Sequence, residues 1–267
     1  MKNPKAAILV AMLVMLIPEL ARAQAKAAQT QPTPANPPAQ TSTPAGSNAD
    51  GKTLLAKLIE ASGGTAKLQS VHSIRLKMLV NAKTEQGDMS IDLEQLAVYP
   101  DRSYEKLGLP MGDITIVTSP AASFMVTDQG TQDLPEAQKE DGMNQLKTSE
   151  IQVFQHADDP KYSFTAGGTE KVGGVDAQIL DVNADGVASR WYVDPKTGRV
   201  LRTSEHVVDM AGAAQRVLDF SDWKEFGGIP FPTKAKITRD GQDGGSVEIK
   251  DIEINPPVDE KLFAKPQ

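Results

Sequence analysis

The spacing of apolar positions changes along the chain and predicts two kinds of element. Between residues 54 and 59 the apolar residues recur at helical spacing, which predicts a helix that ends at Gly63-Gly64. From Ile74 to Ala82 every second residue is apolar, which predicts a strand with one buried face. Similar alternation, interrupted by turn residues, continues to Ile254 and predicts about ten or eleven strands at hairpin spacing.

The order of these elements narrows the fold class. Strands do not alternate with helices, so we do not expect a doubly wound parallel sheet. One antiparallel sheet with so many twisted strands must curl. We therefore expect an α+β fold with a single large curved antiparallel sheet, a half-barrel. Residues 132–157 lack alternation and predict short helices that plug the concave face.

The N-terminal segment differs from the rest and predicts export. Lys2 and Lys5 precede an apolar run of 12 residues, Ala6 to Ile17, and Ala21-Arg22-Ala23 forms a small-residue cleavage site. A membrane anchor is the alternative, but a spanning helix needs roughly 20 apolar residues. Residues 1–23 are therefore predicted to be a cleaved signal peptide. The predicted destination is the periplasm.

The composition changes again after this segment. Residues 24–50 contain five prolines and no Val, Ile, Leu, Met or aromatic residue. Such a sequence has little apolar surface with which to offset the entropy cost of ordering, so we predict a disordered linker. Residues 51–267 have the length and patterning of one folded domain.

Composition and motifs exclude several kinds of chemistry. The chain has no cysteine and a net charge of −7, so disulfides and thiolate sites are excluded and nucleic acid is not an expected partner. Asp181-x-Asn183-x-Asp185-Gly186 begins like a calcium loop, but its twelfth position is Tyr192 instead of glutamate. We predict no metal, no cofactor and no catalytic residue. A hydrolase with carboxylates or His156 converging in one pocket is the alternative.

Several stretches, in this order along the chain, resemble the outer-membrane lipoprotein-sorting (LolA-like and LolB-like) superfamily. These stretches are Ala61–Val71 with Ile74–Met78, Tyr99–Glu105, Asp194–Arg202, and Gly228–Pro232 with Asn255–Phe263. The resemblance implies a half-barrel with an apolar cavity that holds lipid acyl chains. Family members shuttle lipoproteins across the periplasm or sense them. Tyr99 stands where the dedicated carrier has an arginine, and the nearest arginine is Arg102.

These observations predict a function and a set of ligand contacts. We expect an exported, non-catalytic carrier or binding protein for lipoproteins or lipid acyl chains. The alternative is a periplasmic protein-interaction or envelope-sensing module with an envelope protein partner. The candidate residues are Met78, Val80, Ile91, Leu93, Tyr99, Arg102 and Tyr104. The first four, which are apolar, would line the cavity or fill a closed core, and the last three, which are polar, would hold the headgroup at the rim.

Overall fold

The computed structural model describes residues 48–84, 87–110, 112–209 and 212–266. The predicted signal peptide and nearly all of the predicted linker lie outside these residues. The first helix begins at Asn48, within the segment assigned to the linker from sequence. Among the described helices, none combines the length and the apolarity that a bilayer span requires.

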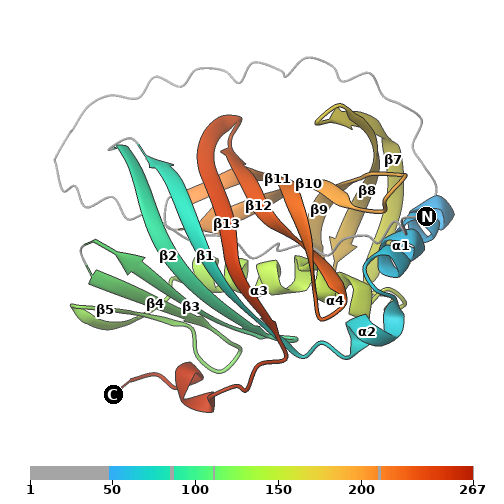
Figure 1. Cartoon of the computed structure of the whole chain (residues 1–267). Helices are drawn as coiled ribbons and strands as arrows, with labels where there is room; N and C mark the ends of the chain where they lie inside the picture. Colours follow the sequence, from blue (N-terminus) through green and yellow to red (C-terminus); the bar gives the residue numbers. More distant parts are fainter. Residues whose placement is uncertain (1–47, 85–86, 111, 210–211, 267) are drawn as a thin grey trace, which may run out of the picture.

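Among the described residues, one antiparallel sheet of thirteen strands makes up most of the fold (Figure 1). Its spatial order is β6-β5-β4-β3-β2-β1-β13-β12-β11-β10-β9-β8-β7, so β6 and β7 form its two edges. The strands are β1 (Ser73–Thr84), β2 (Gly87–Val98), β3 (Arg102–Leu109), β4 (Gly112–Thr118), β5 (Phe124–Thr127), β6 (Gly130–Asp133), β7 (Tyr162–Val172), β8 (Val175–Ala184), β9 (Val187–Val193), β10 (Val200–Asp209), β11 (Gly212–Phe226), β12 (Ile229–Arg239) and β13 (Gln242–Ile254).

Within the described part of the chain, four α-helices and one 3-10 helix accompany the sheet. They are α1 (Asn48–Ala61), α2 (Thr65–Gln69), α3 (Glu136–Thr148), α4 (Glu150–Gln155) and η1 (Glu260–Phe263). Helix α3 contacts β3 and β4 from one wing of the sheet and β8, β9 and β10 from the other. It therefore lies inside the curve. The predicted half-barrel with helices at its concave face is confirmed.

The strand count is higher than the ten or eleven predicted from the sequence. Strand β6 is four residues long, and its sequence Gly-Thr-Gln-Asp contains no apolar residue. It is held by pairing with β5, from Phe124↔Asp133 to Thr127↔Gly130. Periodicity cannot reveal a strand without an apolar face, because the signal is the alternation itself.

The middle of the sheet follows the predicted alternation. Ile74, Leu76 and Met78 on β1 are buried, and the residues between them are more exposed. Met78 pairs with Leu93 on β2 and with Ile249 on β13, so apolar side chains from three strands share the concave face. This face carries most of the apolar core, because the largest buried cluster includes all of them.

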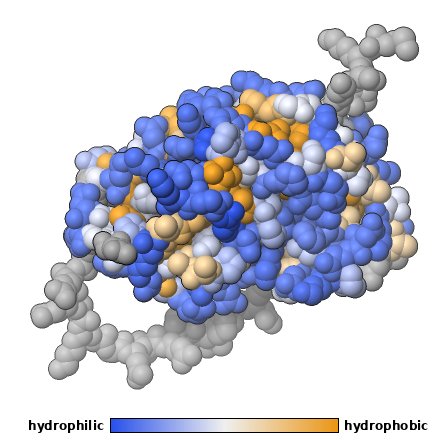
Figure 2. Space-filling view, turned by 90° about the horizontal axis from the view of Figure 1, so that it is seen from below, coloured by the Kyte–Doolittle hydropathy of each residue, from blue (hydrophilic) through white to orange (hydrophobic). Residues whose placement is uncertain are grey.

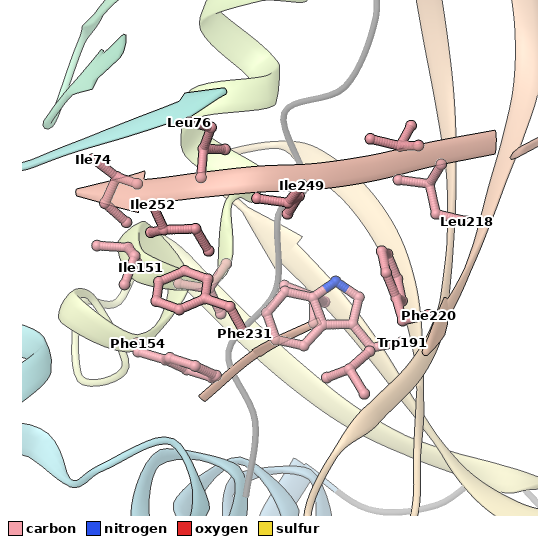
Figure 3. Close-up of a cluster of buried hydrophobic side chains, with 14 of the residues drawn as sticks. Ile74, Leu76, Ile151, Phe154, Trp191, Leu218, Phe220, Phe231, Ile249 and Ile252 are labelled. Atoms are coloured by element: carbon pink, nitrogen blue, oxygen red, sulfur yellow. The ribbon is translucent and has the colours of Figure 1, made fainter. Parts of the chain in front are cut away.

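The helices α1 and α4 complete the apolar core. Figure 3 shows Ile151 and Phe154 of α4 among the buried side chains of the sheet. The ring of Phe154 on α4 meets that of Trp191 on β9 edge to face, with centroids 6.0 Å apart. Ser149 caps α4 by accepting a hydrogen bond from the backbone N–H of Gln152. Helix α1 approaches β7 so closely that a Cβ on Gly51 would lie 2.2 Å from the carbonyl oxygen of Phe164. Only glycine fits at that contact.

Candidate functional site

The four apolar candidates lie together on the concave face. Met78 pairs with Leu93, and Val80 pairs with Ile91. All four side chains are at most 2% exposed and belong to the largest core cluster. Adjacent strands thus form one continuous apolar layer, assembled from the positions that the alternation selected, and other side chains of the core cover it.

Tyr99 lies on the concave side of the sheet, as the four apolar candidates do, and is close to α3. It packs against a small cluster formed by Ala97 and Leu146, beside Met143. Its hydroxyl is hydrogen-bonded to the side chain of Ser149, and burial raises its pKa well above the usual range despite that bond. Tyr99 is therefore a neutral phenol at the junction of β2 with the two interior helices.

Arg102 and Tyr104 face the other way. Glu105 pairs with Gln95 across β2 and β3, on the concave face, so the alternate positions 102 and 104 point to the convex face. There Arg102 forms an ion pair with Glu260 and lies 4.7 Å from the ring centroid of Phe263. The C-terminal helix η1 thus engages Arg102, which lies on the opposite face of the sheet from Met78 and Leu93.

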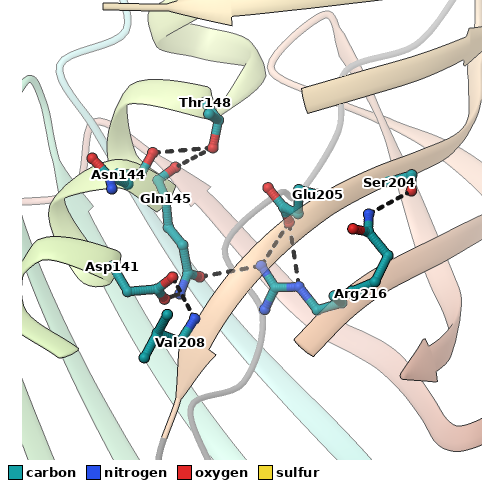
Figure 4. A network of polar contacts seen from close by, with 9 residues as sticks. Asp141, Asn144, Gln145, Thr148, Ser204, Glu205, Val208 and Arg216 are labelled. Atoms are coloured by element: carbon teal, nitrogen blue, oxygen red, sulfur yellow. Dashed lines mark hydrogen bonds and ion pairs between the residues drawn. The ribbon is translucent and has the colours of Figure 1, made fainter. Parts of the chain in front are cut away.

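Helix α3 has an unusual inner face, which the sequence analysis missed. Asp141, Gln145 and Thr148 follow one another at helical spacing, and all three are buried against the sheet (Figure 4). A buried helix normally turns its apolar stripe inward. Here a polar stripe points inward instead, so the interior beneath α3 is polar.

The polar stripe is tied to β10 and β11 through a buried ion pair. Arg216 donates to Glu205 at 2.7 Å, and both side chains are nearly inaccessible. Arg216 also reaches the amide oxygen of Gln145 at 3.4 Å. Gln145 in turn donates to Asp141, which accepts a hydrogen bond from the backbone N–H of Val208 at 2.7 Å. The network in Figure 4 therefore holds α3 against this wing of the sheet.

The other wing contributes a second buried pair. The side-chain amide of Gln95 donates to Glu105 at 3.0 Å. Burial raises the pKa of Glu105, and the charge of Asp141 raises it further, whereas the Gln95 hydrogen bond and Arg216 oppose the shift. Burial also raises the pKa of Asp141. Glu105 thus interacts electrostatically with groups from α3 and β11, although it belongs to β3.

The described surface also contains an open pocket of about 810 Å³ outside the concave face. Helix α1 and the turns after β9 and β11 surround it, and its charged lining includes Lys57, Lys67, Asp194 and Glu225. Lys67 donates to the carbonyl oxygen of Gly228 at 2.9 Å. None of the seven candidate residues lines this pocket.

Among the described residues, no group of three or more His, Asp or Glu side chains has an arrangement that could hold a metal ion. Seen from below in Figure 2, the surface is mostly hydrophilic, and its apolar side chains form small separate patches. The extended apolar surfaces that the strands provide face inward, where the core cluster lies.

Comparison with known proteins gives a clear structural likeness. No protein-family model and no curated protein matches the chain. A domain from Vibrio parahaemolyticus described as outer membrane lipoprotein-sorting has a TM-score of 0.53 at 14% identity, covering 81% of this chain and 97% of that one. A LolA superfamily protein from Nitrosomonas europaea has a TM-score of 0.52 at 12% identity, covering 80% of this chain and 97% of that one.

A third structure extends the likeness. A DUF1329 family protein from Desulfovibrio piger has a TM-score of 0.52 at 11% identity, covering 81% of this chain and 96% of that one. Because fold does not determine function and the identities are this low, the likeness concerns the fold. The half-barrel fold that the resemblance in sequence motifs implied is confirmed.

Proposed function

We propose that the protein is an exported, non-catalytic binding protein that holds lipid or lipoprotein acyl chains against the concave face of its half-barrel. The observation that carries this proposal is the continuous apolar layer built by β1 and β2 and including Met78, Val80, Ile91 and Leu93. Other core side chains cover this layer, so an acyl chain would have to displace them. Burial of an acyl chain is favourable by about 0.8 kcal/mol for each CH₂ group.

The fold supports the same proposal. The structural neighbours with this half-barrel include a domain described as outer membrane lipoprotein-sorting. The predicted signal peptide would deliver the chain to the periplasm, where such a carrier works. The proposed partners are therefore acyl chains of lipids or lipoproteins, together with an envelope protein that delivers or receives them.

The test is to purify the full chain without detergent from an exporting bacterial host. Lipid bound to it is then measured by native mass spectrometry and by mass spectrometry of solvent extracts. A pyrene-labelled acylglycerol supplies an affinity for the same sample. We expect co-purified lipid in about equimolar amount, and saturable binding of the probe. Absence of both would refute the proposal.

A pair of variants locates the binding surface. Ile91→Trp fills space at the concave face, whereas Leu79→Trp adds the same ring to the convex face of the adjacent strand. We expect the first variant to weaken probe binding about tenfold or more, and the second to leave it unchanged. Thermal unfolding shows whether each variant is folded, since overpacking alone costs about 1–3 kcal/mol. If both variants fold and change the probe affinity equally, the acyl chain does not bind at the concave face.

A further inference from the structure

Four buried polar atoms at the concave face have no hydrogen-bond partner among the described residues. They are Gln95 Oε1, Glu105 Oε2, Ser189 Oγ and Thr203 Oγ1. Each residue is more than nine-tenths buried. A buried polar atom without a partner costs about 1–3 kcal/mol, so a group that forms hydrogen bonds with these atoms would be stabilised there.

The four atoms belong to two strand pairs that face α3. Gln95 lies directly opposite Glu105 on β2 and β3. Ser189 lies opposite Glu205 on β9 and β10, and Thr203 shares the face of Glu205 because it is two residues away on the same strand. Glu205 is joined through Arg216 to Gln145 of α3, and Glu105 interacts with Arg216 and Asp141. Both pairs therefore point into the polar interior beneath α3.

The chemistry of these atoms restricts what can bind there. Gln95 Oε1 is an acceptor, and Glu105 Oε2 beside it is an acceptor when the carboxyl is ionised, so a partner for both atoms in that state must donate hydrogen bonds. The charges nearby disfavour an anion. Glu105, Asp141 and Glu205 supply three carboxyl groups, whereas Arg216 is already paired with Glu205 at 2.7 Å.

The direction of an acyl chain attached to such a group follows from the strands. Along β2, Leu93 and Ile91 follow Gln95 on the same face, and on β3 Leu107 follows Glu105. Met78 and Val80 pair with these β2 residues from β1. A headgroup at Gln95 and Glu105 would thus place its chain along the apolar surface.

We propose that Gln95 and Glu105 bind the headgroup of the acyl ligand, and that this headgroup donates hydrogen bonds and carries no negative charge, as the hydroxyls of a monoacylglycerol do. The proposal rests on the proposed function and specifies its ligand class. A donor beside Glu105 also stabilises the ionised carboxylate, which burial otherwise disfavours.

The experiment compares two ligands that share one chain, 1-monopalmitoylglycerol and palmitate, by displacement of the pyrene probe from the full chain at neutral pH. We expect monopalmitoylglycerol to bind about tenfold more tightly than palmitate, because its headgroup gains one or two hydrogen bonds and avoids a charge repulsion. Palmitate that binds equally well or better would overturn the proposal, and equal binding is also the result if water alone satisfies the four atoms.

Variants test the two residues separately. Glu105→Gln removes the charge but keeps the shape, so palmitate should bind about tenfold better while monopalmitoylglycerol changes by less than about threefold. Gln95→Leu should weaken monopalmitoylglycerol about tenfold and leave palmitate unchanged. Glu94→Gln is the matched control, since Glu94 lies on the convex face beside Arg75.

The outcomes separate this proposal from the proposed function. If both ligands bind but Glu105→Gln leaves their affinity ratio unchanged, the headgroup assignment is wrong and the carrier function stands. If neither ligand binds and no lipid co-purifies, both proposals fail. Should Gln95→Leu not fold, Glu105→Gln still decides the headgroup assignment, because it replaces a carboxyl with an amide of the same size.

Discussion

Arg216 on β11 and Glu205 on β10 form an ion pair of 2.7 Å inside the half-barrel, and Arg216 also contacts Gln145 of α3. The pair therefore belongs both to the sheet and to the docking of an interior helix. A polar group of this kind is expensive to bury unless every partner is present. Its removal should be costly even though it contributes little as an isolated attraction.

Arg216→Met should lower the free energy of unfolding by about 3–5 kcal/mol, because Glu205 is left as a buried charge without its cation. Urea denaturation measures the change. The control is Arg190→Met, which removes the exposed ion pair with Asp181 at 2.6 Å on β8 and β9 and should cost less than about 1 kcal/mol. Similar losses in both variants would mean that the Arg216 pair is effectively solvated.

The raised pKa of Glu105 predicts a pH dependence of stability. A carboxyl whose pKa is higher in the folded protein binds its proton more tightly there, so its contribution is present at low pH and is lost as pH rises through the folded value. Glu105→Gln should therefore gain stability relative to the unmodified protein as pH increases above 4.5, the ordinary value for glutamate. Urea titrations across the acid and neutral range measure this difference, and a difference that shrinks with pH would contradict the sign.

Gly51→Ala should destabilise the protein by about 1–3 kcal/mol, because the new Cβ would lie 2.2 Å from the carbonyl oxygen of Phe164 and α1 would have to shift away from β7. Hydrogen exchange should then increase in α1 and in β7. Gly108→Ala is the matched control, since the nearest atom to its Cβ would be 3.6 Å away. Unchanged exchange in α1 would show that the helix adjusts without loss.

Arg102→Met tests the separation of the two faces. It removes a partly exposed ion pair with Glu260 and a contact with the ring of Phe263, so the expected loss of stability is about 1 kcal/mol or less. Because Arg102 lies on the convex face, affinity for the pyrene probe should not change. A tenfold loss of probe affinity in this variant would restore Arg102 as a headgroup contact.

The half-barrel was predictable because its evidence is local. The alternation of Ile74, Leu76, Met78 and Val80 reports a strand and its buried face at once, and Pro and Gly mark the turns between strands. The apolar part of the candidate site came from the same signal. The resemblance in sequence motifs also implied that the sheet wraps around its helices.

The polar part of the site was not predictable in the same way. Asp141, Gln145 and Thr148 have helical spacing, but polar residues on a helix ordinarily face solvent, so nothing local marks them as buried. Glu205 and Arg216 occupy inward positions of their strands, which alternation assigns to apolar residues. Only the packing of α3 between the two wings brings these groups and Glu105 together.

The short polar strand β6 has a consequence for how copies of the protein behave toward one another. An open sheet offers unpaired backbone groups at its edges, and such an edge can recruit a strand from a second molecule. At this edge four residues without an apolar side chain present few such groups, and Lys265 crosses to Asp133 at 2.6 Å. Polymerisation through β6 is thereby disfavoured, which would suit the carrier function proposed above.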